Sequence, residues 1–345
     1  MKTNLVCSIL PPYILERLAR STDPDIRRRA RRALAEAEGY RLARSKPVLG
    51  PLPARAPKGK RRAIYDAGGK ATLPGHLVRS EGSQMAPDVA VNEAYDHSGT
   101  TYDFYAKIFG RNSLDDEGMK LVSSVHVGDE DGEPLTNAYW NGAQMAYGDG
   151  DGRIFRRFTR SLDVIGHELT HGVESFTSNL LYQGQSGALN EHFADVFGVL
   201  VRQWKRGEPA SEASWVVGED ILVPAPTRRG IRDMERPGTA FVNDPYLGTD
   251  PQPAHVKDYY TGKLDRGGVH LNSGIPNRAF ALTATRLGGR AWEVAGRIWY
   301  DTLLQLSNVA GFLECARVTF RLAKLHGDVA QQAVRDSWAA VGISV

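Results

Sequence analysis

The pattern of apolar and polar positions divides the chain into a part built of short runs and a part with helical spacing. Between residues 63 and 155, apolar or β-branched runs are punctuated by Gly, Asp and Asn, which predicts strands and turns, most clearly over 120–129 and 135–152. The stretch 92–110 differs, because its aromatic residues share one helical face. After residue 160, helical spacing predicts helices over 161–177, 187–206, 273–287, 290–306, 309–325 and 328–341, with a long irregular segment over 208–265. Strands followed by helices indicate an α+β architecture in two lobes.

The first 62 residues follow a third pattern. Residues 12–38 have the spacing of a basic amphipathic helix. Thr22-Asp23-Pro24 is expected to interrupt it and to cap a second helix, with Pro24 at the first helical position. Residues 45–62 are rich in Pro, Gly, Lys and Arg, so they are predicted to form a linker that is open to proteolytic nicking.

The composition is that of a soluble globular protein with a sizeable core, since 41% of the 345 residues are apolar and 24% are charged. No apolar run approaches the roughly 20 residues that span a bilayer. The N-terminus lacks a full apolar core and a small-residue cleavage site, so we expect no Sec signal peptide. The chain is then cytoplasmic as synthesised, or leaves the cell by a non-classical route. Cys7 and Cys315 lie too far apart in the sequence to suggest a disulfide framework.

Charge is distributed unevenly. Residues 1–62 carry 16 Lys/Arg against 5 Asp/Glu, whereas the rest of the chain is acidic. Such a basic segment could bind nucleic acid or an anionic surface, or it could pack on the chain's own acidic body. We favour the second interpretation, because an enzyme motif dominates the remainder.

That motif is His167-Glu168-Leu169-Thr170-His171. Residues four apart on a helix project from the same face, so both imidazoles can bind one zinc ion. Glu168 can reach a zinc-bound water without being a ligand, which suits a general base. A catalytic zinc needs three protein ligands and an open position.

The third ligand is expected from a second helix. Glu191 follows His171 by twenty residues, and an antiparallel helix can bring it opposite the histidine pair. Asp195, one turn later, can accept the free ring N–H of one histidine. His192 lies about 100° round the helix from Glu191, so it is interpreted as a surface or packing residue.

A third element, 265–274, contains His270 within a Gly-rich loop. By itself such a histidine is usually structural. Beside a zinc–water site, however, peptide hydrolysis needs a donor for the developing oxyanion. Asp265 could orient His270 and keep it protonated near neutral pH.

Four ordered segments now resemble the thermolysin family of neutral zinc metallopeptidases: NAYWNGAQMAYGDGD, HELTH, SGALNEHFADVFG and DRGGVHLNSG. The resemblance covers about 63–345. It implies a β-rich N-terminal lobe, a helical C-terminal lobe and a cleft between them with zinc at its floor. It also implies a zinc-dependent endopeptidase that cleaves on the amino side of bulky hydrophobic residues.

Position by position, the resemblance implies the roles of individual residues. The zinc ligands correspond to His167, His171 and Glu191, the general base to Glu168, and the supporting carboxylate to Asp195. The oxyanion-stabilising residues correspond to Tyr182 and His270, with Asp265 as the partner of His270. The groups that bind the peptide main chain correspond to Asn137, the Ala138 backbone and Arg232. The pocket on the primed side corresponds to Phe155, Phe158, Val164, Val217, Ile221 and Ile231.

The chain departs from the family at its paired calcium site. Asp163 and Glu219 match calcium ligands, but other ligand positions hold Arg202, Ser214 and Val216, and Arg229 stands near another expected carboxylate. Calcium takes six to eight oxygen ligands, and a guanidinium supplies none. We therefore expect Arg202 to pair with Asp163, and no double calcium site.

A short basic N-terminus with Pro11-Pro12-Tyr13-Ile14-Leu15 resembles the protealysin-like branch, whose prosegment is removed on maturation. The implied organisation is a propeptide over 1–50, a linker and processing region over 51–62, a β-rich lobe over 63–185 and a helical lobe over 186–345. The expected partners are protein or peptide substrates and the chain's own propeptide, as inhibitor or chaperone, in a monomer. Cys7 could act as a thiolate switch on zinc, although an ordinary thiol is the commoner case. The competing hypothesis is a zinc-stabilised module that binds nucleic acid through its basic helix.

Overall fold

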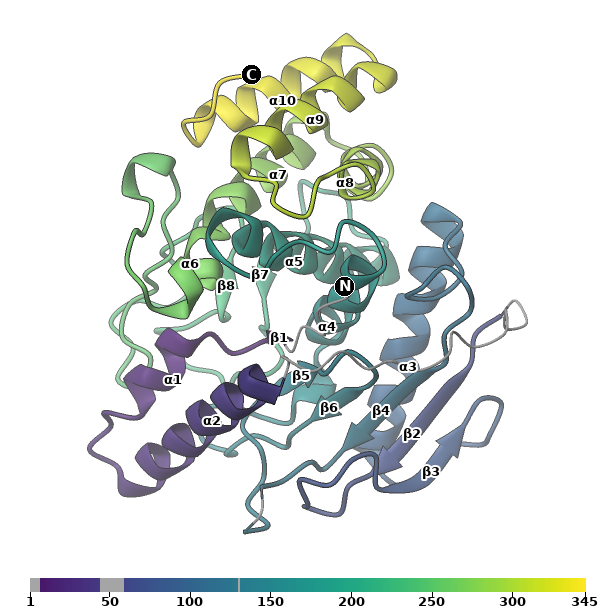
Figure 1. Ribbon diagram of the computed structural model, residues 1–345, viewed down its shortest axis with the longest axis vertical. Coiled ribbons are helices and arrows are strands. Elements are labelled where there is room, and N and C mark those ends of the chain that lie inside the picture. The colour runs from purple at the N-terminus through teal and green to yellow at the C-terminus, as the bar shows by residue number, and fades with distance from the viewer. Residues whose placement is uncertain (1–6, 44–58, 130) are drawn as a thin grey trace.

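A computed structural model describes residues 7–43, 59–129 and 131–345. It has two lobes: a mixed sheet flanked by a helix, and a group of helices at the other end of the molecule (Figure 1). The helices α4 (Leu162–Ser175) and α5 (Gly184–Arg206) lie between them. The predicted α+β architecture in two lobes is confirmed.

The sheet has six strands in the order β1-β5-β6-β4-β2-β3. Their bounds are β1 (Cys7–Ser8), β2 (Arg62–Asp66), β3 (His76–Ser80), β4 (Leu121–Val125), β5 (Ala138–Trp140) and β6 (Met145–Tyr147). Strand β4 pairs in parallel with β2 and β6, and the other pairs are antiparallel. The last three strands in sequence fall in the two segments for which strands were most clearly predicted.

The helix expected over 92–110 is also present. It comprises α3 (Val89–Phe104) and a π-helical turn, η1 (Tyr105–Phe109). The Asp88 side chain accepts a hydrogen bond from Val91 N at 2.9 Å and so caps its first turn. Tyr95 and Tyr105 are buried as their helical face predicts, and α3 lies along the sheet (Figure 1).

The N-terminal segment forms β1, α1 (Pro12–Leu18) and α2 (Pro24–Ala43). The interruption occurs where it was predicted, because Asp23 Oδ1 accepts the N–H groups of Asp25 and Ile26 and so caps α2. The buried face of α1 consists of Pro12, Ile14, Leu15 and Leu18.

This segment packs on the body of the protein, as the charge pattern suggested. Strand β1 adds an edge strand to the sheet beside β5. On α2, Arg32 contacts Asp129 at 2.7 Å and Arg29 contacts Glu133 at 2.8 Å. The basic helix therefore neutralises an acidic loop of its own chain.

The C-terminal helices follow the predicted ranges, with shifted ends. They are α7 (Gly274–Leu287), α8 (Ala295–Leu303), α9 (Phe312–Ala323) and α10 (Asp328–Ala340). A further helix, α6 (Asp265–Asn272), lies where a Gly-rich loop was expected. Short 3-10 turns are η2 (Phe158–Arg160), η3 (Val256–Asp258) and η4 (Lys324–His326). The segment expected to be irregular, 208–265, contains one small hairpin of β7 (Val216–Val217) and β8 (Arg232–Asp233). None of the helices in the described ranges is long and apolar enough to cross a bilayer.

Two glycines let α4 and α5 approach closely. A Cβ on Gly198 of α5 would lie 2.5 Å from the carbonyl oxygen of Asp163 and 2.9 Å from the amide nitrogen of His167, both on α4. A Cβ on Gly166 would in turn meet Gly198 Cα at 3.0 Å. Only hydrogen atoms fit at this crossing, so the two helices that carry the motif residues are in backbone contact.

Candidate active site

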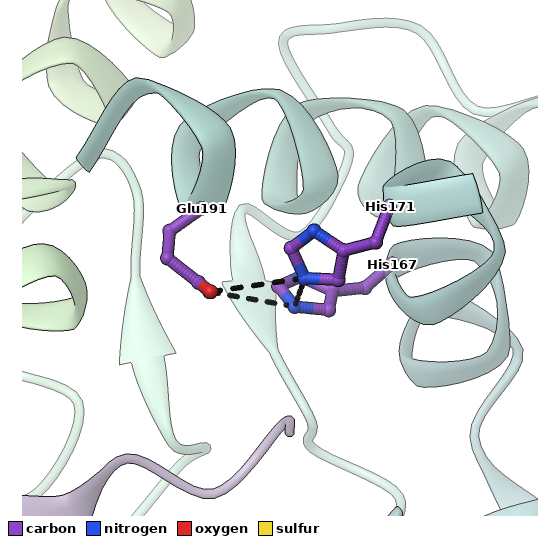
Figure 2. Close-up of side chains that lie close together, drawn as sticks. All are labelled: His167, His171 and Glu191. Atoms are coloured by element: carbon purple, nitrogen blue, oxygen red, sulfur yellow. Dashed lines mark hydrogen bonds and ion pairs between the residues drawn. The ribbon is translucent and has the colours of Figure 1, made fainter. Parts of the chain in front are cut away.

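The histidines of the HExxH motif and the distant carboxylate come together. His167 and His171 on α4 have their Nε2 atoms 3.1 Å apart, with perpendicular rings. Glu191 on α5 places its carboxylate oxygens 3.5 Å from His167 Nε2 and 3.7 Å from His171 Nε2 (Figure 2). One ligand atom from each of the three lies within 4.8 Å of the others, and all three side chains are buried.

Each imidazole is oriented by a carboxylate on its other nitrogen. His167 Nδ1 lies 2.9 Å from Asp195 Oδ1, which is the supporting contact that the sequence predicted. His171 Nδ1 lies 3.0 Å from Glu174 Oε2, a partner that sequence reasoning missed. The signal was available, since Glu174 follows His171 by three residues on the same helix.

This donor set fits a zinc ion. We assign the ring protons to the two Nδ1 atoms, because these face carboxylates, so both Nε2 lone pairs point into the shared space. Glu191 Oε2 is buried there and accepts no hydrogen bond from the described residues. Two lone pairs and a carboxylate oxygen repel each other unless a cation lies among them. Two imidazoles and one carboxylate also leave a position open, as catalytic zinc requires.

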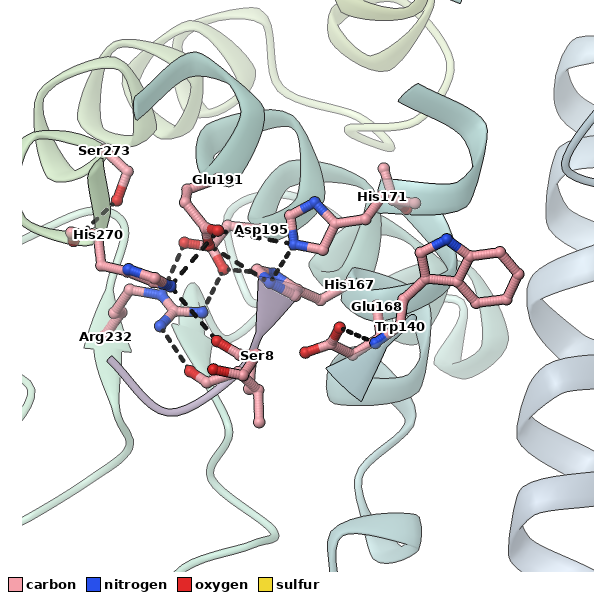
Figure 3. Close-up of polar contacts among 12 residues, drawn as sticks. Ser8, Trp140, His167, Glu168, His171, Glu191, Asp195, Arg232, His270 and Ser273 are labelled. Atoms are coloured by element: carbon pink, nitrogen blue, oxygen red, sulfur yellow. Dashed lines mark hydrogen bonds and ion pairs between the residues drawn. The ribbon is translucent and has the colours of Figure 1, made fainter. Parts of the chain in front are cut away.

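Glu168 lies beside the triad without joining it (Figure 3). Its Oε2 accepts the backbone N–H of Trp140 on β5 at 3.0 Å. Burial, and then the neighbouring Glu191 carboxylate, raise the pKa of Glu168 well above its ordinary value. A buried carboxylate of raised basicity next to a metal position has the properties of a general base.

His270 approaches the triad from α6 on the opposite side. Its Nδ1 lies 2.9 Å from Asp265 Oδ1, and its backbone N–H donates to Asp265 Oδ2 at 2.8 Å. Burial opposes protonation of the ring, but Asp265 and Glu191 outweigh it and raise the pKa of His270. His270 was expected in a loop, and that expectation is wrong: Arg266 to Gly268 are left-handed, but the chain is helical again around His270.

The hydroxyl of Tyr182 lies close to both groups. It donates to Glu191 Oε1 and lies 3.3 Å from His270 Nε2. Tyr182 and His270 thus point toward the same side of the triad.

The groups expected to bind a peptide main chain do so with the chain's own N-terminal segment. Ile9 N donates to Ala138 O at 3.2 Å, and Leu10 N donates to Asn137 Oδ1 at 3.2 Å. Arg232 donates to the carbonyl oxygen of Ile9 at 3.1 Å (Figure 3).

Arg232 is held in place by Asp195. Its Nε and second terminal nitrogen each donate to that carboxylate at 2.8 Å. Burial opposes ionisation of Asp195, but Arg232 and His167 outweigh it and hold the pKa of Asp195 well below its usual range. One carboxylate therefore orients both His167 and Arg232.

The six residues expected in the primed-side pocket are all buried in one apolar cluster with Ile9 and Leu10: Phe155, Phe158, Val164, Val217, Ile221 and Ile231. Phe155 and Phe158 stack with their ring centroids 6.1 Å apart. Ile9 itself has no exposed surface.

Two expectations need refinement. The propeptide was expected to act as inhibitor or chaperone; the residues that reach the triad are Ser8, Ile9 and Leu10, which precede the Pro-Pro-Tyr-Ile-Leu element, and α1 begins only at Pro12. His192 is a packing residue rather than a surface one, since its ring lies 2.8 Å from both Asn277 Oδ1 and Trp299 Nε1. The proposed switch role of Cys7 lies outside the described side chains.

At the position of the family's paired calcium site, Arg202 replaces a ligand as expected. It donates to Asp163 Oδ2 at 2.5 Å and lies 3.5 Å from Glu219. It also donates to the carbonyl oxygens of Ser214 at 3.0 Å and Val216 at 2.8 Å. The predicted ion pair is confirmed, and the absence of calcium here stays a prediction.

Comparison with protein families agrees with this geometry. Residues 55–175 match the description "Thermolysin metallopeptidase, catalytic domain", and residues 178–343 match "Thermolysin metallopeptidase, alpha-helical domain".

Individual relatives match over most or all of the chain. An "Extracellular metalloprotease" from Pectobacterium carotovorum subsp. carotovorum is 46% identical and aligns with 100% of this chain and 99% of its own length. "Protease PrtS" from Photorhabdus sp. (strain Az29) is 53% identical over 82% of this chain and 76% of its own. The solved structure "Precursor of Protealysin, Metalloproteinase from Serratia proteamaculans" has a TM-score of 0.88 and 47% identity, covering 98% of this chain and 100% of that one. The chain therefore belongs to the thermolysin family of zinc metallopeptidases, in its protealysin-like branch, and is the precursor form of such an endopeptidase.

Proposed function

We propose that His167, His171 and Glu191 hold the zinc ion and that Glu168 is the general base of peptide hydrolysis. The observation that carries this proposal is the convergence of the three ligands beside a buried carboxylate that is not one of them. When bound, zinc supplies a Lewis acid that polarises a carbonyl group and lowers the pKa of a coordinated water.

Glu168 takes a proton from the attacking water and delivers it to the leaving nitrogen. Its raised pKa suits this role, because the base must accept a proton near neutral pH and release it again. The hydrogen bond from Trp140 N fixes one oxygen and leaves the carboxylate no freedom to swing away.

His270 and Tyr182 stabilise the oxyanion that develops at the scissile carbonyl. Asp265 holds His270 in the charged form, so that Nε2 is a donor. Preorganised donors of this kind contribute about 3–4 kcal/mol each to transition-state stability.

Asn137, Ala138 and Arg232 bind the substrate main chain on the primed side of the cut. The apolar cluster around Phe158 and Ile231 would receive the side chain that follows the scissile bond. The enzyme is therefore expected to cleave before bulky hydrophobic residues in proteins or peptides.

The N-terminal segment acts as an intramolecular inhibitor. It occupies the main-chain donors and acceptors that a substrate needs, and its Ile9 is buried in the large apolar core that also contains the proposed pocket residues. The uncut chain should therefore be less active than a chain cut within 45–62, and equal activity of the two on casein would contradict inhibition. The names of the relatives support action on proteins outside the cell.

Substitution separates the base from the ligands. After cleavage in the 45–62 linker, Glu168→Gln should keep about one zinc per chain while kcat/KM falls by about 10²–10⁴-fold. His167→Ala should lose the zinc itself, whereas His76→Ala, on an exposed histidine of β3, should change neither property. Zinc is counted by atomic emission, and activity is measured with and without a chelator. An active Glu168→Gln enzyme would exclude Glu168 as the base.

A further inference from the structure

The N-terminal segment lies in the cleft with a definite register. That register places one particular peptide bond of the segment beside the proposed catalytic residues. We propose that the Ser8–Ile9 peptide bond is a substrate of the chain's own active site, which hydrolyses it while the rest of the segment stays bound. This inference rests on the proposed function, because it uses the same base, oxyanion donors and main-chain contacts.

The carbonyl group of Ser8 lies where a scissile carbonyl belongs. Its oxygen is 3.3 Å from His270 Nε2 (Figure 3). The Tyr182 hydroxyl lies 3.3 Å from the same nitrogen, so one of the two donors proposed for the oxyanion contacts this carbonyl and the other lies next to that donor. The backbone of Ser8 is fixed by strand pairing with Tyr139.

The next atom along the chain, Ile9 N, lies where a leaving nitrogen belongs. It donates to Ala138 O at 3.2 Å and faces the Glu168 carboxylate. Arg232 then binds Ile9 O and Asn137 binds Leu10 N. Every main-chain contact proposed for a substrate is made in register, starting from the Ser8–Ile9 bond.

The side chains fit the same register. Ile9 follows the bond directly, is fully buried, and belongs to the same large apolar core cluster as the residues proposed to line the primed-side pocket. A bulky aliphatic side chain is the type that this cluster favours.

The chemistry needs only water. Its oxygen bonds to the carbonyl carbon of Ser8, the carbon–nitrogen bond breaks, and Glu168 carries one proton from the water to Ile9 N. The second water proton passes to the amine when the new Ser8 carboxyl group ionises, so the products are a Ser8 carboxylate and an Ile9 ammonium group, with no change in oxidation state.

The cut does not free the cleft. The residues after Ile9 remain anchored through Leu10, the buried face of α1 and the arginines of α2. A leaving amine that stays beside the acyl group favours resynthesis, so the bond is hydrolysed slowly and the cut chain stays inhibited.

Intact-mass spectrometry of the zinc-loaded full chain tests the proposal. We expect a species beginning at Ile9 and a peptide ending at Ser8, which gains one heavy oxygen in ¹⁸O-labelled water. The rate should not depend on protein concentration, because the reaction is intramolecular. Ile9→Gly should slow the cut at least tenfold, whereas the matched variant Ile9→Leu should preserve it and Glu168→Gln should abolish it. An intact Ser8–Ile9 bond after days, or a cut at a neighbouring bond, would overturn the proposal.

Hydrogen exchange supplies a readout that does not require catalysis. In the Glu168→Gln full chain, the Ile9 and Leu10 amides should be protected at least tenfold more than in an Ile9→Asp version of that chain. Equal exchange rates of these amides in the two chains would show that the N-terminal segment does not bind in the proposed register. The full chain carrying Ile9→Asp alone, in which the segment is displaced, should digest casein. If the Ile9→Asp chain digests casein while the Ser8–Ile9 bond of the wild-type chain stays intact, the self-cleavage proposal is wrong but the endopeptidase function stands. If the Ile9→Asp chain digests nothing, the proposed endopeptidase function is wrong as well.

Discussion

Each histidine of the triad has its own carboxylate behind it. Asp195 serves His167 and is itself neutralised by Arg232, while Glu174 serves His171. A carboxylate hydrogen-bonded to the far nitrogen increases the basicity of a ligating imidazole and fixes its orientation.

Glu174→Gln should therefore weaken zinc binding by about 10–100-fold without unfolding the protein, because the amide can still accept a hydrogen bond but carries no charge. Competition with a chromogenic chelator measures the affinity. Glu293→Gln, a change at a side chain that is 56% exposed, is the matched control. Unchanged zinc affinity in Glu174→Gln would show that the charge of Glu174 behind His171 does not contribute to zinc binding.

A second prediction at this scale concerns pH. His126 follows β4 directly, with its Nδ1 2.8 Å from Asp149 and its Nε2 3.1 Å from Asp88. The hydrogen bond with Asp149 raises the pKa of His126 to about 9, against 6.5 for an ordinary histidine. The stabilisation is therefore complete below pH 6.5 and is lost as the pH rises to 9.

Because the group is partly exposed, we discount the full linkage and expect a loss of about 1 kcal/mol in the free energy of unfolding between pH 6 and 9.5. Urea denaturation at the two pH values measures it. In His126→Gln this part of the pH dependence should vanish. A wild-type protein that gains stability over this range would refute the assignment.

At the scale of elements, α2 is attached by charge and β1 by hydrogen bonds. Arg28, Arg29 and Arg32 on α2 all lie within 3.4 Å of acidic atoms in the loop 129–133. These pairs are partly exposed, so each contributes about 0.2–1 kcal/mol and is screened by salt. Contacts of β1 with the cleft are buried and should be insensitive to salt.

Once the linker is cut, the N-terminal segment should dissociate about 5–30-fold more readily at 0.5 M than at 0.05 M salt, as screening removes about 1–2 kcal/mol. Arg29→Ala with Arg32→Ala should abolish most of this salt dependence, whereas Arg31→Ala, on an exposed residue of the same helix, should retain it. Recovery of casein-degrading activity reports the release. Release at a rate that is independent of salt would mean that the cleft contacts alone hold the segment.

Sequence reasoning located most elements but erred where glycines occur. The helix expected over 290–306 is only Ala295–Leu303: Gly288 and Gly289, with φ of 66° and 62°, follow the end of α7, and residues 291–294 form turns before α8 begins. Around His270 the error was the opposite, since Asn272 uses its side chain to bond Gly267 O and Tyr260 O and helical geometry resumes after three left-handed residues. Periodicity carries no information about such tertiary compensation.

At the scale of the whole molecule, the triad could be predicted from local motifs, because its residues lie at fixed sequence spacings on two consecutive helices. The pairing of Ser8 with Tyr139 joins residues 131 positions apart, and no periodicity encodes that contact. The charge asymmetry did predict that the basic segment packs on the acidic body of the chain, but not that residues before Pro11 would fill the cleft.

Arg202 connects α5 with the hairpin region and α4, and so affects the whole molecule. It is 1% exposed and pairs with the fully buried Asp163, with Glu219 nearby. Removal of one partner from a buried pair costs about 3–5 kcal/mol, because the remaining charge stays in a medium of low polarity. Arg202→Met should therefore lower the free energy of unfolding by that amount.

The same site predicts the response to calcium. In the wild-type chain the guanidinium occupies the space that Asp163, Glu219 and the carbonyls of Ser214 and Val216 surround, so calcium should leave the melting temperature unchanged. Arg202→Asp replaces that cation with an oxygen ligand, and five protein oxygens plus water approach the six to eight that calcium takes. Its melting temperature should then rise with millimolar calcium and fall with a chelator, whereas Arg202→Met should not respond. A wild-type protein stabilised by calcium would show instead that the arginine does not stand in for the ion.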